Sequence, residues 1–186
     1  MNYLMDRLNL FKYQFQTTHT TTMGMVEDVD DVFWYSVPDG LNTNIAWLVG
    51  HIILGRYEHM LVASGLHKEL HVEKLSIMKN SELFETGSKA LMRAESLSKQ
   101  DLLEDLVLSY DLVMSIFNSA NDSSLDELPF GEFSMAETKG ASFSWAVQHE
   151  MWHVGQISLL RKVLEISSDF KWVKRLNEIW RINTVK

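Results

Sequence analysis

Two histidines with metal-ligand spacing, His149 and His153, stand four positions apart in a largely apolar segment over 143–164. On an α-helix, residues four apart differ by about 40° in direction and about 6 Å in height, so both imidazoles point to one side. A third histidine, His51, lies in a similar apolar segment far upstream. Three imidazole ligands from two packed helices would leave positions for water or substrate, as in catalytic zinc sites.

The same histidines are also compatible with a protein that is not an enzyme. Pairs at this spacing occur by chance, and buried ring nitrogens carry a desolvation penalty unless each finds a partner. A metal ion shared by His51, His149 and His153 would satisfy all three rings at once. Two alternatives remain open beside an enzyme: a non-enzymatic, stress-associated bundle that binds a metal or small ligand, and a metal-free bundle whose histidines hydrogen-bond with one another.

Polar residues near the histidines are candidates for orienting ligands or moving protons; they are Glu58, Gln148, Glu150 and Gln156. Glu58 follows His51 at heptad spacing, which suits a carboxylate behind a ligand, although a solvated residue that pairs with Arg56 or its neighbours is the commoner case. Glu150 points about 100° away from His149. The pattern H-E-x-x-H also occurs in zinc metalloproteases, where the glutamate is the general base. Strand-like alternation is hard to find here, which argues against a protease cleft framed by a sheet edge.

Long helices must position these residues. Apolar residues at spacings of three and four predict helices over about 3–32, 44–64 and from 98 onward, with a turn at 36–40 and a helix end at Gly65. Ser142 or Ser144 is expected to cap the last main helix. Its predicted core face comprises Trp145, His149, Trp152, His153, Gln156, Leu159, Leu160 and Val163.

The remaining segments carry weaker signals. The threonine-rich stretch 17–22 should bend or loosen the first helix, or line a cavity with its hydroxyls. A short helix is expected over 89–95, and the polar stretch 121–140 is a long loop that could cover the site. A short amphipathic helix is expected over about 169–182, packed on the bundle or on a partner subunit. His19, His67 and His71 receive no assigned role.

Composition restricts the class of protein. With 186 residues, 46% of them apolar, the chain is predicted to form one domain over 1–186 with its main bundle at about 3–166. The absence of cysteine excludes disulfides and thiolate ligands within the chain. A net charge of −8 argues against nucleic-acid binding. Without an apolar run of about 18 residues or a signal-like start, we expect no membrane association and a cytoplasmic location.

Two motifs together resemble the DinB-like (DNA-damage-inducible) superfamily: W-L-V-G-H-I over 47–52 and H-E-x-x-H-x-G-Q-I over 149–157. The irregular stretch 83–88 is similar in kind. The resemblance implies an all-α four-helix bundle of up-down-down-up topology with a short C-terminal helix. It also implies one divalent metal ion, zinc or nickel, held by His51, His149 and His153.

That superfamily includes bacillithiol and mycothiol S-transferases, a maleylpyruvate isomerase branch, and proteins described as metal-dependent hydrolases. The resemblance therefore implies a metal-dependent thiol S-transferase or hydrolase acting on a small molecule, such as a low-molecular-weight thiol. It does not select one reaction, because a fold hosts many functions. We also expect a homodimer, given the aromatic residues of the C-terminal segment and the frequency of two-fold assemblies.

Overall fold

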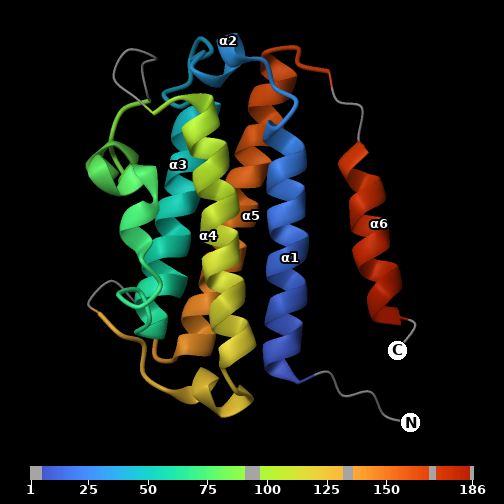
Figure 1. Ribbon diagram of the computed structural model, residues 1–186. Helices are drawn as coiled ribbons and strands as arrows, with labels where there is room; N and C mark the ends of the chain where they lie inside the picture. The colour runs from blue at the N-terminus through green and yellow to red at the C-terminus, as the bar shows by residue number, and fades with distance from the viewer. Residues whose placement is uncertain (1–5, 91–96, 132–135, 168–170, 185–186) are drawn as a thin grey trace.

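Four long helices form the bundle. They are α1 (Arg7–Val26), α3 (Ile45–Arg56), α4 (Lys99–Ser119) and α5 (Lys139–Val163). The computed structural model describes residues 6–90, 97–131, 136–167 and 171–184. Figure 1 shows α1 running up, α3 and α4 down, and α5 up. No strand occurs in these described ranges, so the all-α, up-down-down-up prediction is confirmed.

The second helix of the bundle ends in a wide turn. After α3 the chain continues as a π-helical segment, η1 (Tyr57–Val62), and stops at Gly65, which has a positive φ of 84°. Glycine adopts this left-handed conformation without the steric cost that a side chain would impose, so it ends the helix cleanly. The predicted end at Gly65 is therefore confirmed.

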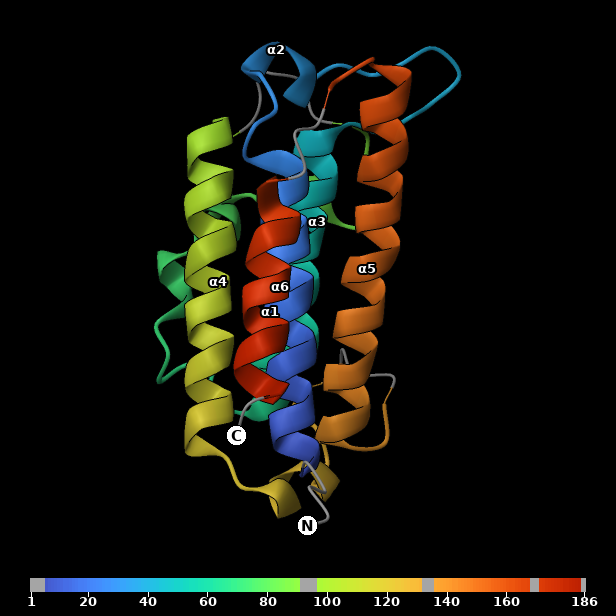
Figure 2. The same cartoon turned by 90° about the vertical axis from the view of Figure 1, so that its right-hand side faces the viewer.

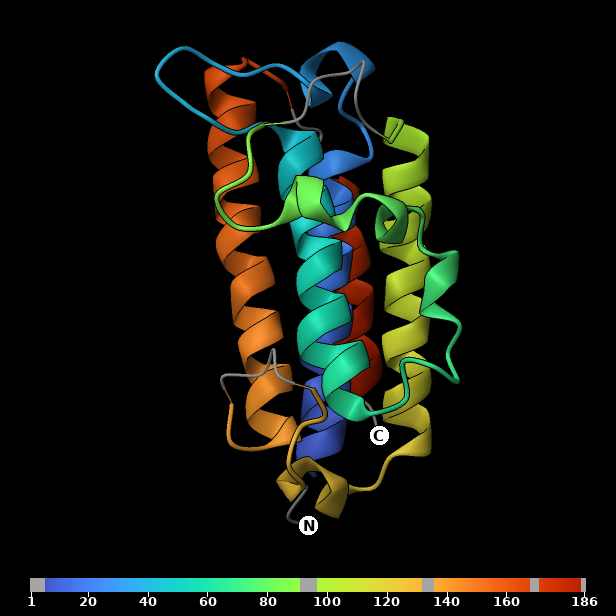
Figure 3. The same ribbon diagram turned by 90° about the vertical axis from the view of Figure 1, so that its left-hand side faces the viewer.

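A long connection carries the chain back from the end of η1 to the start of α4, because both helices run in the same direction. It contains three short 3₁₀ turns, η2 (Val72–Lys74), η3 (Ser76–Lys79) and η4 (Ser81–Phe84). Figure 3 shows this green segment crossing the face of α3. Asp105 of α4 fixes it by accepting hydrogen bonds from the amides of Ser76 and Ile77, both at 2.8 Å. Of the helix expected over 89–95, residues 89 and 90 are not helical and 91–95 lie outside the described residues.

Helix starts follow capping chemistry. The Asp6, Asn44 and Ser98 side chains accept amide hydrogen bonds at the starts of α1, α3 and α4, and Asp101 completes a capping box with Ser98. The chain between α4 and α5 contains a 3₁₀ turn, η5 (Asp122–Asp126).

The predicted cap of α5 was wrong. Thr138 caps this helix by accepting from the amide of Ala141, so α5 begins several residues before the expected Ser142 or Ser144. Ser142 instead lies one turn inside the helix, where its hydroxyl donates to the carbonyl of His59 at 2.8 Å. Sequence pattern did not separate these candidates, because threonine and serine both cap helices well.

The first helix is shorter than predicted and continues without interruption through its threonines. It ends at Val26, and a four-residue helix, α2 (Asp31–Trp34), follows across the top of the bundle. Within the threonine stretch, the hydroxyls of Thr20 and Thr21 each donate to the carbonyl four residues before, at 2.9 Å, and the Thr22 hydroxyl lies 3.0 Å from the Thr18 carbonyl. These bonds satisfy the hydroxyls inside a continuous helix, so the polar stretch does not interrupt α1.

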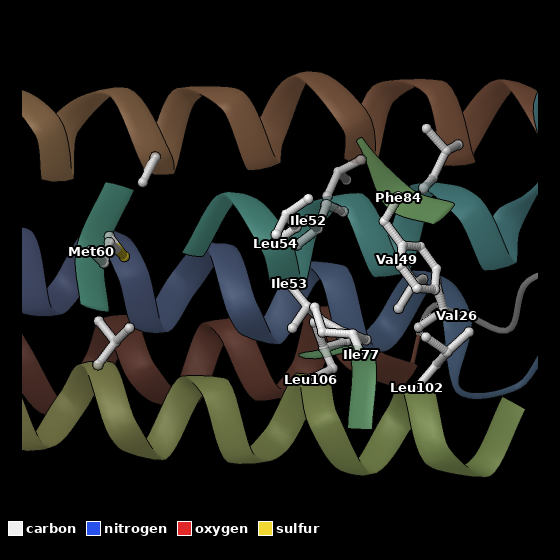
Figure 4. Close-up of a cluster of buried hydrophobic side chains, with 14 of the residues drawn as sticks. Val26, Val49, Ile52, Ile53, Leu54, Met60, Ile77, Phe84, Leu102 and Leu106 are labelled. Atoms are coloured by element: carbon white, nitrogen blue, oxygen red, sulfur yellow. The ribbon is translucent and has the colours of Figure 1, made fainter. Parts of the chain in front are cut away.

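Apolar side chains from α1, α3, α4 and the crossover fill the centre of the bundle. Figure 4 shows a part of this core, in which Val26, Val49, Phe84 and Leu102 lie together at one end. Leucine, valine and phenylalanine buried in this way provide most of the free energy that opposes chain entropy.

The predicted core face of α5 was largely wrong. The buried residues are Ser142, Phe143, Ala146, Glu150, His153, Val154, Ile157, Leu160 and Arg161. Trp145, Trp152, Leu159 and Val163 are exposed. The helix carries two apolar stripes, and the inner one was overlooked because it contains Glu150 and Arg161. Their charges are paired: Glu150 pairs with Arg56 inside the bundle, and Arg161 pairs with Asp28, an exposed residue in the turn after α1.

A C-terminal helix, α6 (Lys171–Thr184), lies along α1 (Figure 2). Trp172 packs so closely on Gly24 that a Cβ atom there would lie 2.2 Å from the tryptophan side chain. Arg175 also pairs with Glu27. The helix expected over 169–182 thus packs on the bundle, with 169 and 170 outside the described residues. Among the helices described, none combines the length and apolarity needed to span a bilayer.

Candidate metal centre

The structure brings together the three histidines that the sequence singled out. His51 comes from α3, and His149 and His153 come from one face of α5. The Nε2 atom of His149 lies 3.2 Å from that of His51 and 3.0 Å from that of His153. The ligand-capable atoms of the three rings all lie within 4.8 Å of one another, and the rings are buried or half-buried.

This spacing fits one small divalent ion. Metal–nitrogen bonds of about 2.0–2.1 Å in a tetrahedral site place neighbouring nitrogen atoms about 3.3 Å apart. The two Nε2 separations of 3.2 and 3.0 Å come within a few tenths of an ångström of that value. The three rings are therefore close enough together to share one ion.

Hydrogen bonds fix the tautomers of two rings. Nδ1 of His51 donates to the carbonyl oxygen of Phe84 at 2.6 Å, and Nδ1 of His153 donates to Oε1 of Gln156 at 2.7 Å. Both partners are acceptors, so the proton of each ring sits on Nδ1 and the Nε2 lone pair faces the centre. Gln156, expected to orient a ligand, lies in position to do so.

Burial keeps the three rings in the neutral form that binds metals. It is the main cause that lowers the pKa of His51, His149 and His153. The charges of His153, His51 and His59 lower the pKa of His149 further, to about 3. Because a protonated imidazole has no lone pair to give, these shifts favour metal binding at neutral pH.

Two glycines of α3 make room for the site. A Cβ at Gly50 would lie 2.0 Å from the Phe84 ring, so this glycine lets η4 approach until the Phe84 carbonyl reaches His51. A Cβ at Gly55 would lie 2.8 Å from Nδ1 of His149. The role of Gly55 was missed because it depends on a contact with a residue 94 positions later.

Trp47 holds the segment after η4 beside the site. Its ring stacks on His51 with 4.7 Å between centroids and 13° between planes. Its Nε1 donates to the Ser88 hydroxyl at 2.7 Å, and that hydroxyl donates to the carbonyl of Leu83 at 2.7 Å. These bonds explain why the first motif begins with a tryptophan.

Glu150 points into the bundle and not toward the converging nitrogens. Its carboxylate accepts from Nε and Nη2 of Arg56 at 2.9 and 2.6 Å and from the Thr22 hydroxyl at 2.5 Å. Arg56 also donates to the Leu106 carbonyl and the Ser109 hydroxyl. This network joins all four long helices, and both oxygens of Glu150 are engaged in it, unlike those of a metalloprotease base.

The other predicted polar residues lie outside the cluster. Glu58 is half-buried, and burial together with the charge of Glu85 raises its pKa. No hydrogen bond found in the described ranges joins Glu58 to the three rings. Gln148 is exposed and donates to the carbonyl and hydroxyl of Ser144. His59 flanks the cluster, with its ring 6.2 Å from that of His149.

The remaining histidines, His19, His67 and His71, lie outside the cluster. His19 stacks on Tyr110 with 4.1 Å between centroids and contacts Arg56 at 3.2 Å. Burial, followed by the charge of Arg56, lowers the pKa of His19 to about 2. His71 is exposed and pairs with Glu73. His67, on the same connection as His71, lies against Phe130 from the segment between α4 and α5.

Comparison with known proteins identifies the family. No curated protein matched the chain. The family model of the DinB superfamily matches residues 14–157. This range includes the three histidines, all of α3 and α4, and most of α1 and α5. Because this match covers most of the chain, the protein belongs to the DinB superfamily.

Proposed function

We propose that this protein is a metal-dependent enzyme that binds one divalent ion, zinc or nickel, through His51, His149 and His153. The expected reaction is thiol S-transfer or hydrolysis, with a small-molecule substrate such as a low-molecular-weight thiol. Three imidazoles suit both metals, and availability then decides between them. Three protein ligands leave positions open for a substrate atom, which is the arrangement of catalytic sites.

The observation that best supports metal binding is that the three Nε2 atoms have too few protons to form hydrogen bonds with one another. His51 and His153 each hold their proton on Nδ1, because Phe84 and Gln156 accept it there. Neutral His149 can offer one Nε2 proton, which serves only one of its two short contacts at 3.2 and 3.0 Å. The Nε2 lone pair at the other contact is then left without a donor. A cation at the centre removes this conflict, so it favours a metal site over a metal-free cluster.

The residues of the chain would prepare such a site for chemistry. When bound, the ion would lower the pKa of a water or thiol and supply a nucleophile near neutral pH. The carbonyl of Phe84 and the amide of Gln156 hold two ligand rings in place and make them better donors. Trp47 covers the His51 ring on one side and limits its exposure to water.

A second candidate function is a non-enzymatic bundle that binds a metal or ligand. It is favoured by the position of Glu150, whose carboxylate is held by Arg56 and Thr22 and so is not free to accept a substrate proton. The response to chelator separates the two functions. A structural ion should lower the unfolding temperature when removed, whereas a catalytic ion can leave the bundle intact.

The first experiment measures metal per chain in protein purified without a nickel column. We expect about one zinc or nickel ion in the wild type and loss of metal in His51→Ala and His153→Ala. His71→Ala is the matched control, because His71 is exposed and paired with Glu73. The loaded protein is then assayed for thiol conjugation and for hydrolysis, and each activity should depend on the ion. A wild type that neither contains nor takes up zinc or nickel would refute the metal site.

A further inference from the structure

A tryptophan ring lies against each of the three histidine rings. We name these residues the tryptophan collar; the pairs are Trp47 with His51, Trp145 with His149, and Trp152 with His153. The centroid separations are 4.7, 6.1 and 6.3 Å, in that order, and the planes differ by 13°, 31° and 11°. Half of the six tryptophans in the chain therefore border the candidate metal centre.

Two collar residues are exposed on the outer face of α5. Trp145 is 38% and Trp152 is 65% accessible to solvent. They are seven residues apart, so they share one side of the helix at a spacing of about 10 Å along its axis. Nothing lies within 4 Å of a Cβ built at Gly155, so the helix surface next to Trp152 is open. Large indole surfaces left open beside a reactive centre are typical of ligand sites.

We propose that the collar binds a planar aromatic group of the substrate, uncharged or anionic, beside the metal. This inference rests on the proposed function, because it assumes an ion at the three histidines. Indole faces attract flat rings through offset stacking and edge contacts. They also attract cations in general, but a divalent ion held by the adjacent imidazoles would repel a second positive charge. The collar therefore selects a ring without positive charge.

The test compares three hydroxamic acids that bind a metal through the same group. Zinc-loaded protein is titrated with acetohydroxamic, benzohydroxamic and cyclohexanecarbohydroxamic acid, and the dissociation constants are measured by calorimetry. We expect the phenyl compound to bind more tightly than the methyl compound and the saturated ring. Trp152→Ala should reduce the phenyl-over-methyl preference about 5- to 10-fold, since an aromatic pair contributes about 1 kcal/mol.

Matched variants separate stacking from general apolar contact. Trp152→Phe keeps a ring and should retain most of the preference. Leu159→Ala removes an apolar side chain of α5 that carries no ring and is 52% exposed, a value between those of Trp145 and Trp152, and it should leave the preference unchanged. Trp145→Ala should lower the preference in the same direction as Trp152→Ala.

The two proposals fail in different ways. If acetohydroxamic acid does not bind the zinc-treated wild type, the metal site itself is wrong. If it binds equally well to wild type and variants but the phenyl compound shows no preference, only the collar is wrong. Light scattering tests a second copy of the chain as the occupant. A wild-type dimer that Trp152→Ala dissociates, with the phenyl preference unchanged, would also overturn the collar as a substrate site.

Discussion

Removing one partner of the Arg56–Glu150 ion pair should destabilise the bundle strongly. The two side chains are only 1% and 2% exposed, and three hydrogen bonds tie the Glu150 carboxylate to Arg56 and Thr22. Arg56→Met leaves a buried carboxylate without its counter-charge, which costs about 3–5 kcal/mol of unfolding free energy. Glu150→Met leaves the guanidinium equally unpaired and should cost a similar amount.

The double variant, Arg56→Met with Glu150→Met, should cost less than either single change. Both charges are then gone, and two methionines can fill the space with apolar contacts. The double variant still loses the guanidinium hydrogen bonds to the Leu106 carbonyl and the Ser109 hydroxyl, and the Thr22 hydroxyl loses an acceptor. These groups retain partners within their own helices, so we expect a net loss of about 1–2 kcal/mol.

Urea denaturation of the metal-free proteins at pH 7, followed by circular dichroism, measures these differences. Arg7→Met is the control, because Arg7 forms its ion pairs with Asp122 and Asp126 on the surface. Its effect should be the smallest of the series, since exposed pairs contribute little. A double variant as unstable as the sum of the two single variants would show that the cost does not come from unpaired charge, and would refute this reasoning.

Three further changes test the metal centre and its surroundings. Gly55→Ala should lower zinc affinity at least about tenfold in a competition titration, because the new methyl would lie 2.8 Å from Nδ1 of His149. Gln156→Leu should weaken zinc binding by about 10- to 100-fold in the same titration, because it removes the acceptor that orients His153. In metal-free protein, His19 contributes stability that is fully present above pH 6.5 and declines as pH falls toward its native pKa of about 2. The unfolding free energy, measured by urea denaturation between pH 7 and 4, falls as the pH is lowered. In His19→Gln this fall should be smaller by about 1.4 kcal/mol per pH unit below pH 6.5.

Each of these changes has a matched control in the chain. Gly155→Ala fills open space on α5, so zinc affinity should hold and helix stability should rise by up to about 1 kcal/mol. Gln148→Leu removes an exposed amide that bonds only within α5 and should leave zinc affinity unchanged. His71→Gln should leave the acid loss as it is. If a control variant changed zinc affinity or acid stability as much as its test variant does, the contact proposed for that test residue would not be the cause of the effect.

Local chemistry made much of the fold predictable. The helix starts near 44 and 98 and the helix end at Gly65 depend on a few neighbouring residues, and each was predicted from the sequence. The histidine cluster was also predictable, because four-residue spacing on a helix fixes the relative direction of His149 and His153. These features need no knowledge of distant contacts.

Features that depend on distant partners were not predictable in this way. The inner face of α5 carries Glu150 and Arg161, which become acceptable in the core only through Arg56 on α3 and Asp28 in the turn after α1. The acceptor for His51 is a backbone carbonyl, that of Phe84, and backbone groups leave no mark in residue type. Periodicity alone therefore chose the wrong stripe of α5.

The ligands come from only two helices, and 98 positions separate His51 from His149. An ion bound to both would close a loop that encloses the crossover and α4. In an unfolded chain, joining points this far apart costs an entropy that amounts to about 4–5 kcal/mol. The unfolded chain would keep at most the local pair on α5 and would give up the third ligand. Zinc transfer to a coloured chelator that is too weak to strip the folded protein should therefore track the cooperative unfolding of the bundle without any label on the protein.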